Sequence, residues 1–211
     1  NAYVNSFVHL EKIVLIEKNK SFGKSPVLKP LKDNGIILKD ICFSYFNSEQ
    51  SLFENLSIEI QKNKHTILTG TNGTGKSTLI GIMSGALQIQ KGEVQQSSSK
   101  ISYVGVNPLI IPGTLKENLL YGNNQIVDDK LINKEIELFE LDVDISNTIS
   151  NSILSSGQMQ KIAFIRAFLM DPEILFLDEA TANLDDNTRI LVGDILRNRE
   201  ITIVNSTHNP E

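Results

Sequence analysis

The stretch LTGTNGTGKSTLI, Leu68–Ile80, decides the fold of this chain. Gly70, Gly73 and Gly75 lie close together and are followed by Lys-Ser-Thr and an apolar run that is typical of a helix. A glycine costs roughly 0.5–1 kcal/mol relative to alanine inside a regular element, because its unfolded backbone has more freedom to lose. The stretch therefore indicates a loop whose backbone serves a purpose other than packing.

The segment GTNGTGKS, Gly70–Ser77, fits the pattern G-x-x-x-x-G-K-S/T between an expected strand at 65–69 and an expected helix at 76–86. Backbone N–H groups that no side chain obstructs wrap phosphates, and the helix N-terminus adds its positive end. Lys76 is expected to reach the β- and γ-phosphates, and the Ser77 hydroxyl to bind Mg²⁺. The alternative is a flexible Gly/Thr turn with an exposed lysine, but the strand–helix context favours a nucleotide loop.

A second polar pair follows a buried apolar run in ILFLDEA, residues 174–180. Asp178 and Glu179 come at the end of this expected strand, where one carboxylate would hold the Mg²⁺ shell and the other would polarise an attacking water. Taken alone, the pair is equally well explained as the acidic N-cap of a helix. The glycine loop earlier in the chain favours the catalytic interpretation.

The segment ILSSGQMQKIAFIRAFL places Ser155, Ser156 and Gly157 before a long amphipathic helix that begins near Gln158. Exposed N–H groups at this helix start would suit a second anion. Taken alone, simple helix capping by serine explains the residues better.

Strand and helix patterns alternate along the chain, which predicts an α/β sheet. Residues 1–18 have the apolar spacing of an amphipathic helix, and residues 18–35 have the composition of a linker. Strands are expected at 36–46, 55–61, 65–69, 173–180 and 201–207, a small hairpin at 92–106, and helices at 76–86, 128–140, 157–170 and 187–198.

The composition is that of an ordinary globular protein, with 40% hydrophobic and 21% charged residues. A net charge of −5 argues against a nucleic-acid binder that works through a broad basic field. The single cysteine, Cys42, excludes an internal disulfide and suggests a reducing compartment. No apolar run approaches the roughly 20 residues that cross a bilayer, and the start at Asn1 suggests a piece of a longer polypeptide.

Taken together, these segments resemble the ATP-binding cassette (ABC) ATPase family over residues 36–211. The matching segments are the phosphate loop Gly70–Ser77, LSSGQ at Leu154–Gln158 beside the family signature LSGGQ, ILFLDE at 174–179, ANLD at Ala182–Asp185, and His208 after the last strand. The resemblance implies a P-loop NTPase fold of the ABC type, with a RecA-like core, a small antiparallel β subdomain and a helical signature subdomain. It also divides the chain into residues 1–35, a helix and linker from a membrane domain, and residues 36–211, an ATPase domain that ends shortly after the switch histidine.

The resemblance assigns roles to individual residues. Glu179 would be the general base, His208 would contact the γ-phosphate, Lys76 would neutralise phosphate charge, and Ser77 and Asp178 would hold Mg²⁺. The residues expected to contact ATP are Tyr45, which is otherwise a core aromatic, Thr71, Asn72, Gly73, Thr74, Gly75, Lys76, Ser77 and Thr78, with Ser155, Ser156, Gly157 and Gln158 acting from a second chain.

The resemblance also implies partners and a location. Two such domains pair head to tail around ATP, with Asp185 near their interface, and each couples to a transmembrane domain at the cytoplasmic face of a membrane; no nucleic acid is involved. GTLKENLLYG, Gly113–Gly122, and the helix expected before residue 19 resemble exporter-type cassettes. The alternatives are a regulatory cassette with little turnover, and a soluble ABC ATPase that does not transport.

Three departures from the family pattern bear on activity. Val106 stands where the family has a glutamine, so either Asn107 substitutes for it or the site couples weakly. The hairpin expected at 92–106 lacks the longer insert of many exporters. The helical subdomain is expected to be trimmed, and the acidic lead-in to the signature is absent from ISNTISNSI, residues 145–153.

Overall fold

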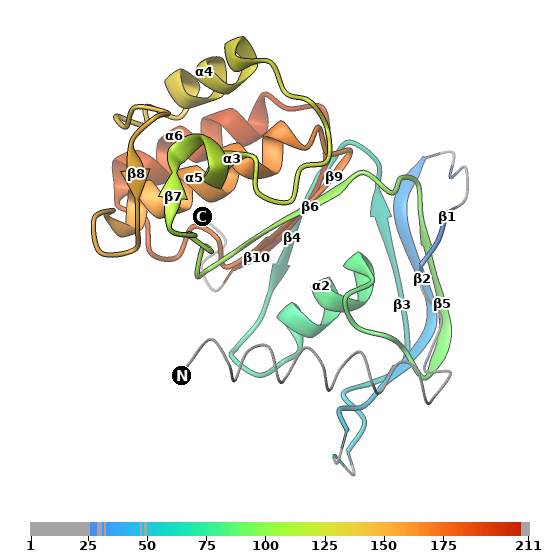
Figure 1. Ribbon diagram of the computed structural model, residues 1–211. Helices are drawn as coiled ribbons and strands as arrows, with labels where there is room; N and C mark the ends of the chain where they lie inside the picture. Colours follow the sequence, from blue (N-terminus) through green and yellow to red (C-terminus); the bar gives the residue numbers. More distant parts are fainter. Residues whose placement is uncertain (1–25, 29–30, 32, 47, 49, 208–211) are drawn as a thin grey trace.

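The computed structural model describes residues 26–28, 31, 33–46, 48 and 50–207. These residues form two four-stranded sheets with one helix between them and a helical region beyond (Figure 1). The expected α/β architecture is confirmed. The helix expected over residues 1–18 and His208 lie outside the described residues.

The inner sheet is entirely parallel and has the strand order β4-β10-β9-β6. Its strands are β4 (His65–Thr69), β10 (Thr202–Thr207), β9 (Ile174–Asp178) and β6 (Ile101–Gly105). The continuous apolar run of β9 is buried on both faces, as its sequence predicts. All four strands run the same way, so their carboxyl ends meet at one edge of the sheet.

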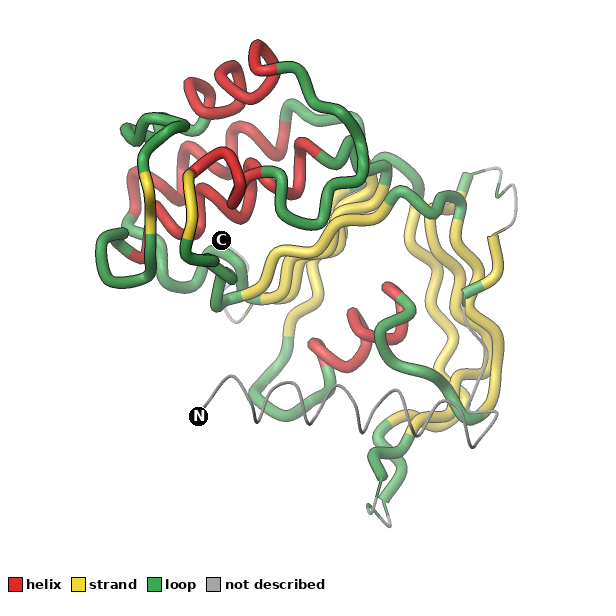
Figure 2. Tube along the Cα trace, in the orientation of Figure 1, coloured by secondary structure: helices red, strands yellow, loops and turns green. Residues whose placement is uncertain are grey.

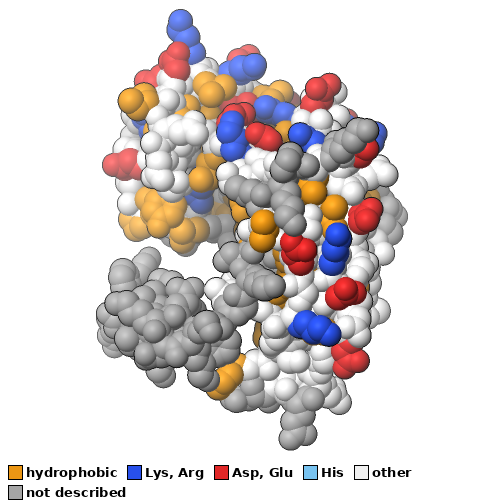
Figure 3. Space-filling view, turned by 90° about the vertical axis from the view of Figure 1, so that its right-hand side faces the viewer, with side chains coloured by type: hydrophobic (Ala, Val, Ile, Leu, Met, Phe, Trp, Pro, Cys, Tyr) orange, Lys and Arg blue, Asp and Glu red, His pale blue; other side chains and the backbone are white. Residues whose placement is uncertain are grey.

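The outer sheet is largely antiparallel and has the order β1-β5-β2-β3, with only β1 and β5 paired in parallel. Its strands are β1 (Val27–Leu28), β5 (Lys91–Gln96), β2 (Asn34–Phe43) and β3 (Phe53–Gln61). Figure 3 views the molecule from the side of this outer sheet. On the surface seen there, acidic and basic side chains are interspersed and form no separate acidic or basic patch.

Helix α2 (Lys76–Ser84) lies between the two sheets (Figure 2). Ile80, Ile82 and Met83 of this helix are completely buried, in one core with residues of both sheets. From the inner sheet, Phe176 joins this core. The helix that follows the glycine loop is thus held on two sides, which fixes the position of its N-terminus.

The opposite face of the inner sheet is covered by the helical region, whose core includes Leu175 and Leu177 of β9. This region contains α3 (Leu115–Leu119), α4 (Asp129–Leu138), α5 (Ser156–Leu169), α6 (Asp186–Arg197) and the short pair β7 (Gly113–Thr114) and β8 (Thr148–Ile149). None of α3, β7 and β8 was expected, because elements this short give no readable periodicity.

The hairpin expected at 92–106 is wrong. Strand β5 pairs with β1 and β2 in the outer sheet, whereas β6 pairs with β9 in the inner sheet. The residues between them cross from one sheet to the other. Two adjacent strand patterns with a short connection read as a hairpin, and nothing local shows that their partners lie elsewhere.

The linker expected over residues 18–35 also needs correction where the structure describes it. Val27–Leu28 pairs with Gln95 and Gln96 of β5, and β2 begins at Asn34. A two-residue strand and its flanking proline are too short to stand out from a linker composition. The division of the chain into residues 1–35 and 36–211 stays a prediction.

Candidate functional site

The glycine loop leaves β4 and enters α2 through backbone conformations that only glycine adopts easily. Gly73 has φ 80° and Gly75, the N-cap of α2, has φ 94°, and no side chain caps this helix. The first N–H groups of α2 therefore have no capping side chain. They point out of the helix N-terminus, where the positive end of the helix dipole also favours an anion. The Thr74 hydroxyl donates to the Thr71 carbonyl at 2.9 Å, which closes the loop on itself.

Lys76 begins α2, and its side chain folds back over the loop. Its ammonium donates to the carbonyl oxygens of Gly70 at 2.7 Å and Thr71 at 3.0 Å. These two bonds hold the positive charge at the centre of the loop, where it adds to the field of the backbone N–H groups. The arrangement suits a polyphosphate.

Asp178 ends β9 and lies beside the start of α2. Its Oδ1 accepts hydrogen bonds from the Ser77 hydroxyl at 2.9 Å and the Ser206 hydroxyl at 2.6 Å, and its Oδ2 accepts one from the Tyr103 hydroxyl at 3.2 Å. The expected juxtaposition of Ser77 and Asp178 is therefore present, across a large separation in sequence.

These donors fit a magnesium site of the kind that shares its ion with a nucleotide. Mg²⁺ prefers oxygen ligands and is commonly held by one or two carboxylates together with substrate phosphates. Ser77 and Asp178 supply such oxygens at the mouth of the loop. Among the described residues there is no group of three or more His, Cys, Asp or Glu side chains that would hold a metal alone.

Glu179 follows Asp178 and turns the chain sharply away from the sheet. It has φ 52°, a left-handed conformation that is uncommon for a non-glycine residue. Its N–H donates to the Ser206 carbonyl at 3.1 Å and contacts the Ser206 hydroxyl at 3.2 Å. The β10 strand thus helps to hold Glu179 at the pocket, in a conformation that costs about 1–3 kcal/mol.

The loop, Tyr45 and Glu179 surround a pocket of about 320 Å³. Its lining residues are Tyr45, Leu52, Asn72, Gly73, Gly75, Lys76, Ser77, Thr78 and Glu179. Tyr45 is 52% exposed, packs edge-to-face on Phe43 at 5.1 Å, and its hydroxyl lies 2.5 Å from that of Thr78. The tyrosine is therefore a wall of the pocket and is not buried in the core.

The signature residues lie outside this pocket. Ser155 is the N-cap of α5 and forms a capping box with Gln158: the Ser155 side chain accepts from the Gln158 N–H, and the Ser155 N–H donates to Gln158 Oε1 at 3.0 Å. Within this chain, Ser155 therefore does cap the helix, as the simpler interpretation of the sequence predicts. Gln158 also lines a second hollow of about 290 Å³ with Ile153 and Leu154.

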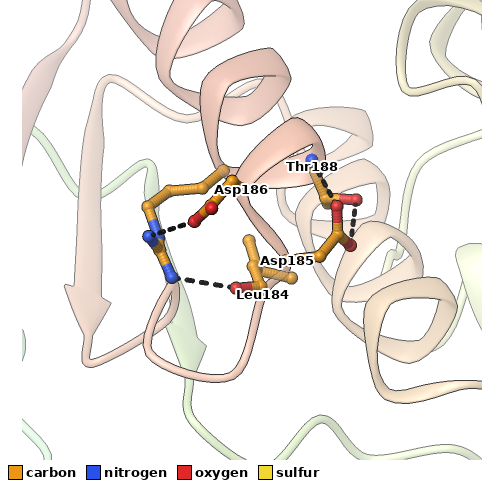
Figure 4. A network of polar contacts seen from close by, with 5 residues as sticks. Leu184, Asp185, Asp186 and Thr188 are labelled. Atoms are coloured by element: carbon orange, nitrogen blue, oxygen red, sulfur yellow. Dashed lines mark hydrogen bonds and ion pairs between the residues drawn. The ribbon is translucent and has the colours of Figure 1, made fainter.

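Asp185 caps α6 through Thr188 (Figure 4). Its carboxylate accepts from the Thr188 N–H at 3.0 Å and the Thr188 hydroxyl at 2.8 Å, and a side chain placed on Gly157 would meet the carboxylate at 3.8 Å. Both hydrogen bonds hold the pKa of Asp185 below its usual value, and the bond from the Thr188 N–H has the larger effect.

Sequence reasoning missed three residues at the site: Leu52, Tyr103 and Ser206. Leu52 lines the pocket, and the other two donate to Asp178. Gly105 and Ser206 are paired with Asp178 across the sheet. The carboxyl ends of parallel strands meet at one edge, and that rule alone would have drawn attention to the ends of β6 and β10.

Val106, where a glutamine was expected, follows directly after the residue that pairs with Asp178. It is half-buried. Position 106 is thus next to the proposed metal site, and its side chain has no polar atom to offer there.

A glycine loop between a strand and a helix, with an aspartate at the end of a neighbouring parallel strand, defines a P-loop nucleotide-binding domain. Comparison with known proteins narrows this class. The family model described as ABC transporter matches residues 53–182.

Individual relatives agree with the family match. The chain is 36% identical to ABC transporter B family member 17 of Arabidopsis thaliana over 167 residues, 69% of the chain and 14% of that protein. It is 32% identical to the ATP-dependent permease MDL1 of Candida albicans over 203 residues, 83% of the chain and 30% of that protein. The chain therefore spans less than a third of the length of either relative.

A structure of a bacterial Atm1-family ABC exporter with ATP bound shares the fold, with a TM-score of 0.79 at 17% identity, covering 97% of the chain and 40% of the exporter chain. This chain belongs to the ABC transporter family, whose members are ATPases. The resemblance drawn from the sequence and the expected ABC-type P-loop fold are confirmed.

Proposed function

We propose that this chain is the domain that binds and hydrolyses ATP in an ABC transporter of the exporter type, working with Mg²⁺ as half of a head-to-tail pair. One observation carries the proposal: the Ser77 hydroxyl and the Asp178 carboxylate are 2.9 Å apart beside the pocket that the glycine loop, Tyr45 and Glu179 enclose. Exporters or permeases among the relatives, such as MDL1, support the transport role. None of the described helices is long and apolar enough to span a bilayer.

The pocket residues divide the work between binding and reaction. Tyr45 would stack on adenine, the loop residues Thr71–Gly75 with Thr78 would surround the phosphates, and Lys76 would exchange its loop carbonyls for phosphate oxygens. Glu179 would orient the attacking water and accept its proton, and His208 would contact the γ-phosphate. Ser77 and Asp178 would hold Mg²⁺, which when bound would neutralise charge on the phosphate oxygens.

The signature residues would act across the pair. Ser155, Ser156, Gly157 and Gln158 do not line the nucleotide pocket of their own chain, while Ser155 and Ser156 are exposed. The N-terminus of α5 is then available to close over the ATP of a second ABC domain. The capping box would hold this helix start in a fixed shape for the contact.

The test is ATP hydrolysis with Mg²⁺ by wild-type protein and Glu179→Gln over a range of protein concentrations. We expect a specific rate that rises with protein concentration, because two chains complete each site, and that disappears in Glu179→Gln. Glu173→Gln is a matched control, since Glu173 is exposed just before the other end of β9. Equal rates in wild type and Glu179→Gln would refute the role of Glu179.

A regulatory cassette that binds ATP with little turnover is a second candidate, and Val106 is the observation that favours it. ATP binding without hydrolysis in the wild type, followed by hydrolysis in Val106→Gln, would support this candidate. A soluble ABC ATPase is the third, and a full-length polypeptide without membrane-spanning segments would support that one.

A further inference from the structure

The Asp178 carboxylate accepts hydrogen bonds from three hydroxyl groups, and only one of them, that of Ser77, belongs to the proposed Mg²⁺ site. Ser77 and Ser206 donate to its Oδ1, and Tyr103 donates to its Oδ2 at 3.2 Å. A carboxylate turns freely about its last side-chain bond, so donors on one oxygen leave its plane poorly defined. Donors on both oxygens fix the plane and therefore the direction of the remaining lone pairs.

Tyr103 reaches Asp178 along its own strand. In β6, Tyr103 pairs with Phe176, and Gly105 pairs with Asp178, two residues further along both strands. The hydroxyl of Tyr103 must therefore pass over position 105 to meet the carboxylate. The side chain is 55% exposed and lies against the sheet surface, not in the core.

Gly105 makes this path possible. A Cβ at position 105 would lie 3.0 Å from Tyr103 Cε1 and 3.1 Å from the Tyr103 hydroxyl. Such distances are tighter than ordinary van der Waals contact, so a side chain there would displace the ring. The glycine has an ordinary backbone conformation here, since it is not among the residues with positive φ; it is needed for space and not for backbone freedom.

The Tyr103 hydroxyl is a dependable donor at neutral pH. A tyrosine hydroxyl titrates near pH 10, so it is protonated at neutral pH. It can therefore donate a hydrogen bond to the Asp178 carboxylate, as its position shows. Val106, just beyond Gly105, has no group that would do this in its place.

We propose that Tyr103 is a positioning residue, which reaches through the space left by Gly105 to hold the Asp178 carboxylate in the orientation that binds Mg²⁺. The inference rests on the proposed function, because it concerns the same nucleotide and metal site. Tyr103 acts through Asp178 and does not itself contact the nucleotide. It supplies a polar contact at the metal site in a chain whose position 106 supplies none.

The experiment measures the dissociation constant of ATP by calorimetry, in EDTA and over a series of Mg²⁺ concentrations, for wild type, Tyr103→Phe and Gly105→Ala. Mg²⁺ should raise the ATP affinity of each protein, and we expect Tyr103→Phe to need about tenfold more Mg²⁺ to reach half of that increase. Tenfold is the lower end of the loss of metal affinity that follows when a residue hydrogen-bonded to a metal ligand is removed. The Mg²⁺-free affinity is expected to stay unchanged. Gly105→Ala should reproduce the shift, and the double variant should show no more than either single one.

Tyr121→Phe is the matched control, because Tyr121 is 48% exposed and lies against Arg166, away from the pocket lining. It should bind like the wild type. A Tyr103→Phe protein with the wild-type Mg²⁺ dependence would overturn the inference, and so would an equal loss of affinity with and without Mg²⁺. A wild-type protein whose ATP affinity does not respond to Mg²⁺ would instead refute the proposed function.

Discussion

At the scale of single residues, the phosphate loop shows two different reasons for a glycine. Both Gly73 and Gly75 have left-handed backbones, at φ 80° and 94°. Around Gly73 there is open space, whereas a Cβ on Gly75 would lie 2.8 Å from Phe53 Cζ and 3.2 Å from Leu52 Cδ2. Backbone conformation alone requires the first glycine, and backbone and packing together require the second.

Alanine substitutions separate these reasons. Gly73→Ala should lower the free energy of unfolding by about 1–2 kcal/mol, the cost of a left-handed alanine. Gly75→Ala should lose about 1–3 kcal/mol more, because its methyl group crowds Phe53 and Leu52. Urea denaturation of both variants measures the difference. Equal losses would show that the neighbouring side chains move aside without cost.

At the scale of elements, side chains cap several helix starts outside the pocket. Thr114 with Glu117 and Ser155 with Gln158 form capping boxes, and Asp185 caps α6 through Thr188 (Figure 4). Next to this cap, Asp186 pairs with Arg189 at 3.0 Å. The two adjacent aspartates therefore do different work, one on the helix backbone and one on the surface.

The Asp185 cap should make part of the stability depend on acid. Its pKa is lower in the folded protein, chiefly because the Thr188 N–H binds the carboxylate. In the unfolded chain the Asp185 carboxylate is protonated near pH 4, whereas in the folded chain it stays ionised to a lower pH. The cap therefore stabilises the fold above about pH 4, and this stabilisation is lost as the pH falls through the folded pKa. Asp185→Asn, which still caps but does not titrate, should lose less stability in acid than the wild type.

Thermal unfolding between neutral pH and pH about 3 tests this. Asp186→Asn is the control, and it should keep the acid-dependent loss that comes from Asp185. If Asp185→Asn lost as much stability in acid as the wild type, other carboxylates would be responsible.

At the scale of the whole molecule, α2 joins the two sheets into one cooperative unit. Met83 is completely buried in a core that contains residues of β2 and β3 on one side and Phe176 of β9 on the other. The helix that carries Lys76 and Ser77 is therefore supported by both sheets. Loosening either sheet would move the phosphate loop relative to Asp178.

Met83→Ala should lower the free energy of unfolding by about 2–5 kcal/mol, since it opens a cavity in that shared core. The loss should appear as one transition, with both sheets unfolding together. Urea denaturation followed by circular dichroism measures it. Met159→Ala is the control: Met159 is only half-buried, so its loss should be smaller. Two separate transitions in Met83→Ala would contradict the single unit.

The sequence by itself determined the features that are written locally. The glycine loop, the buried strand β9 with the carboxylates at its end, and the serine cap of α5 are all runs of neighbouring residues whose spacing follows from helix, strand or turn geometry. The family and the α/β fold followed from these runs, and both are confirmed. The roles of the individual site residues remain predictions.

Only the tertiary structure decided which strands are neighbours, and with that the surroundings of Asp178. The patterns of β5 and β6 read locally as a hairpin, but the two strands belong to different sheets. Tyr103, Gly105 and Ser206 meet Asp178 only because β6, β9 and β10 pair in parallel and in one register. Register between distant strands is set by the packing of whole sheets against α2 and the helical region, and no short stretch of sequence contains that information.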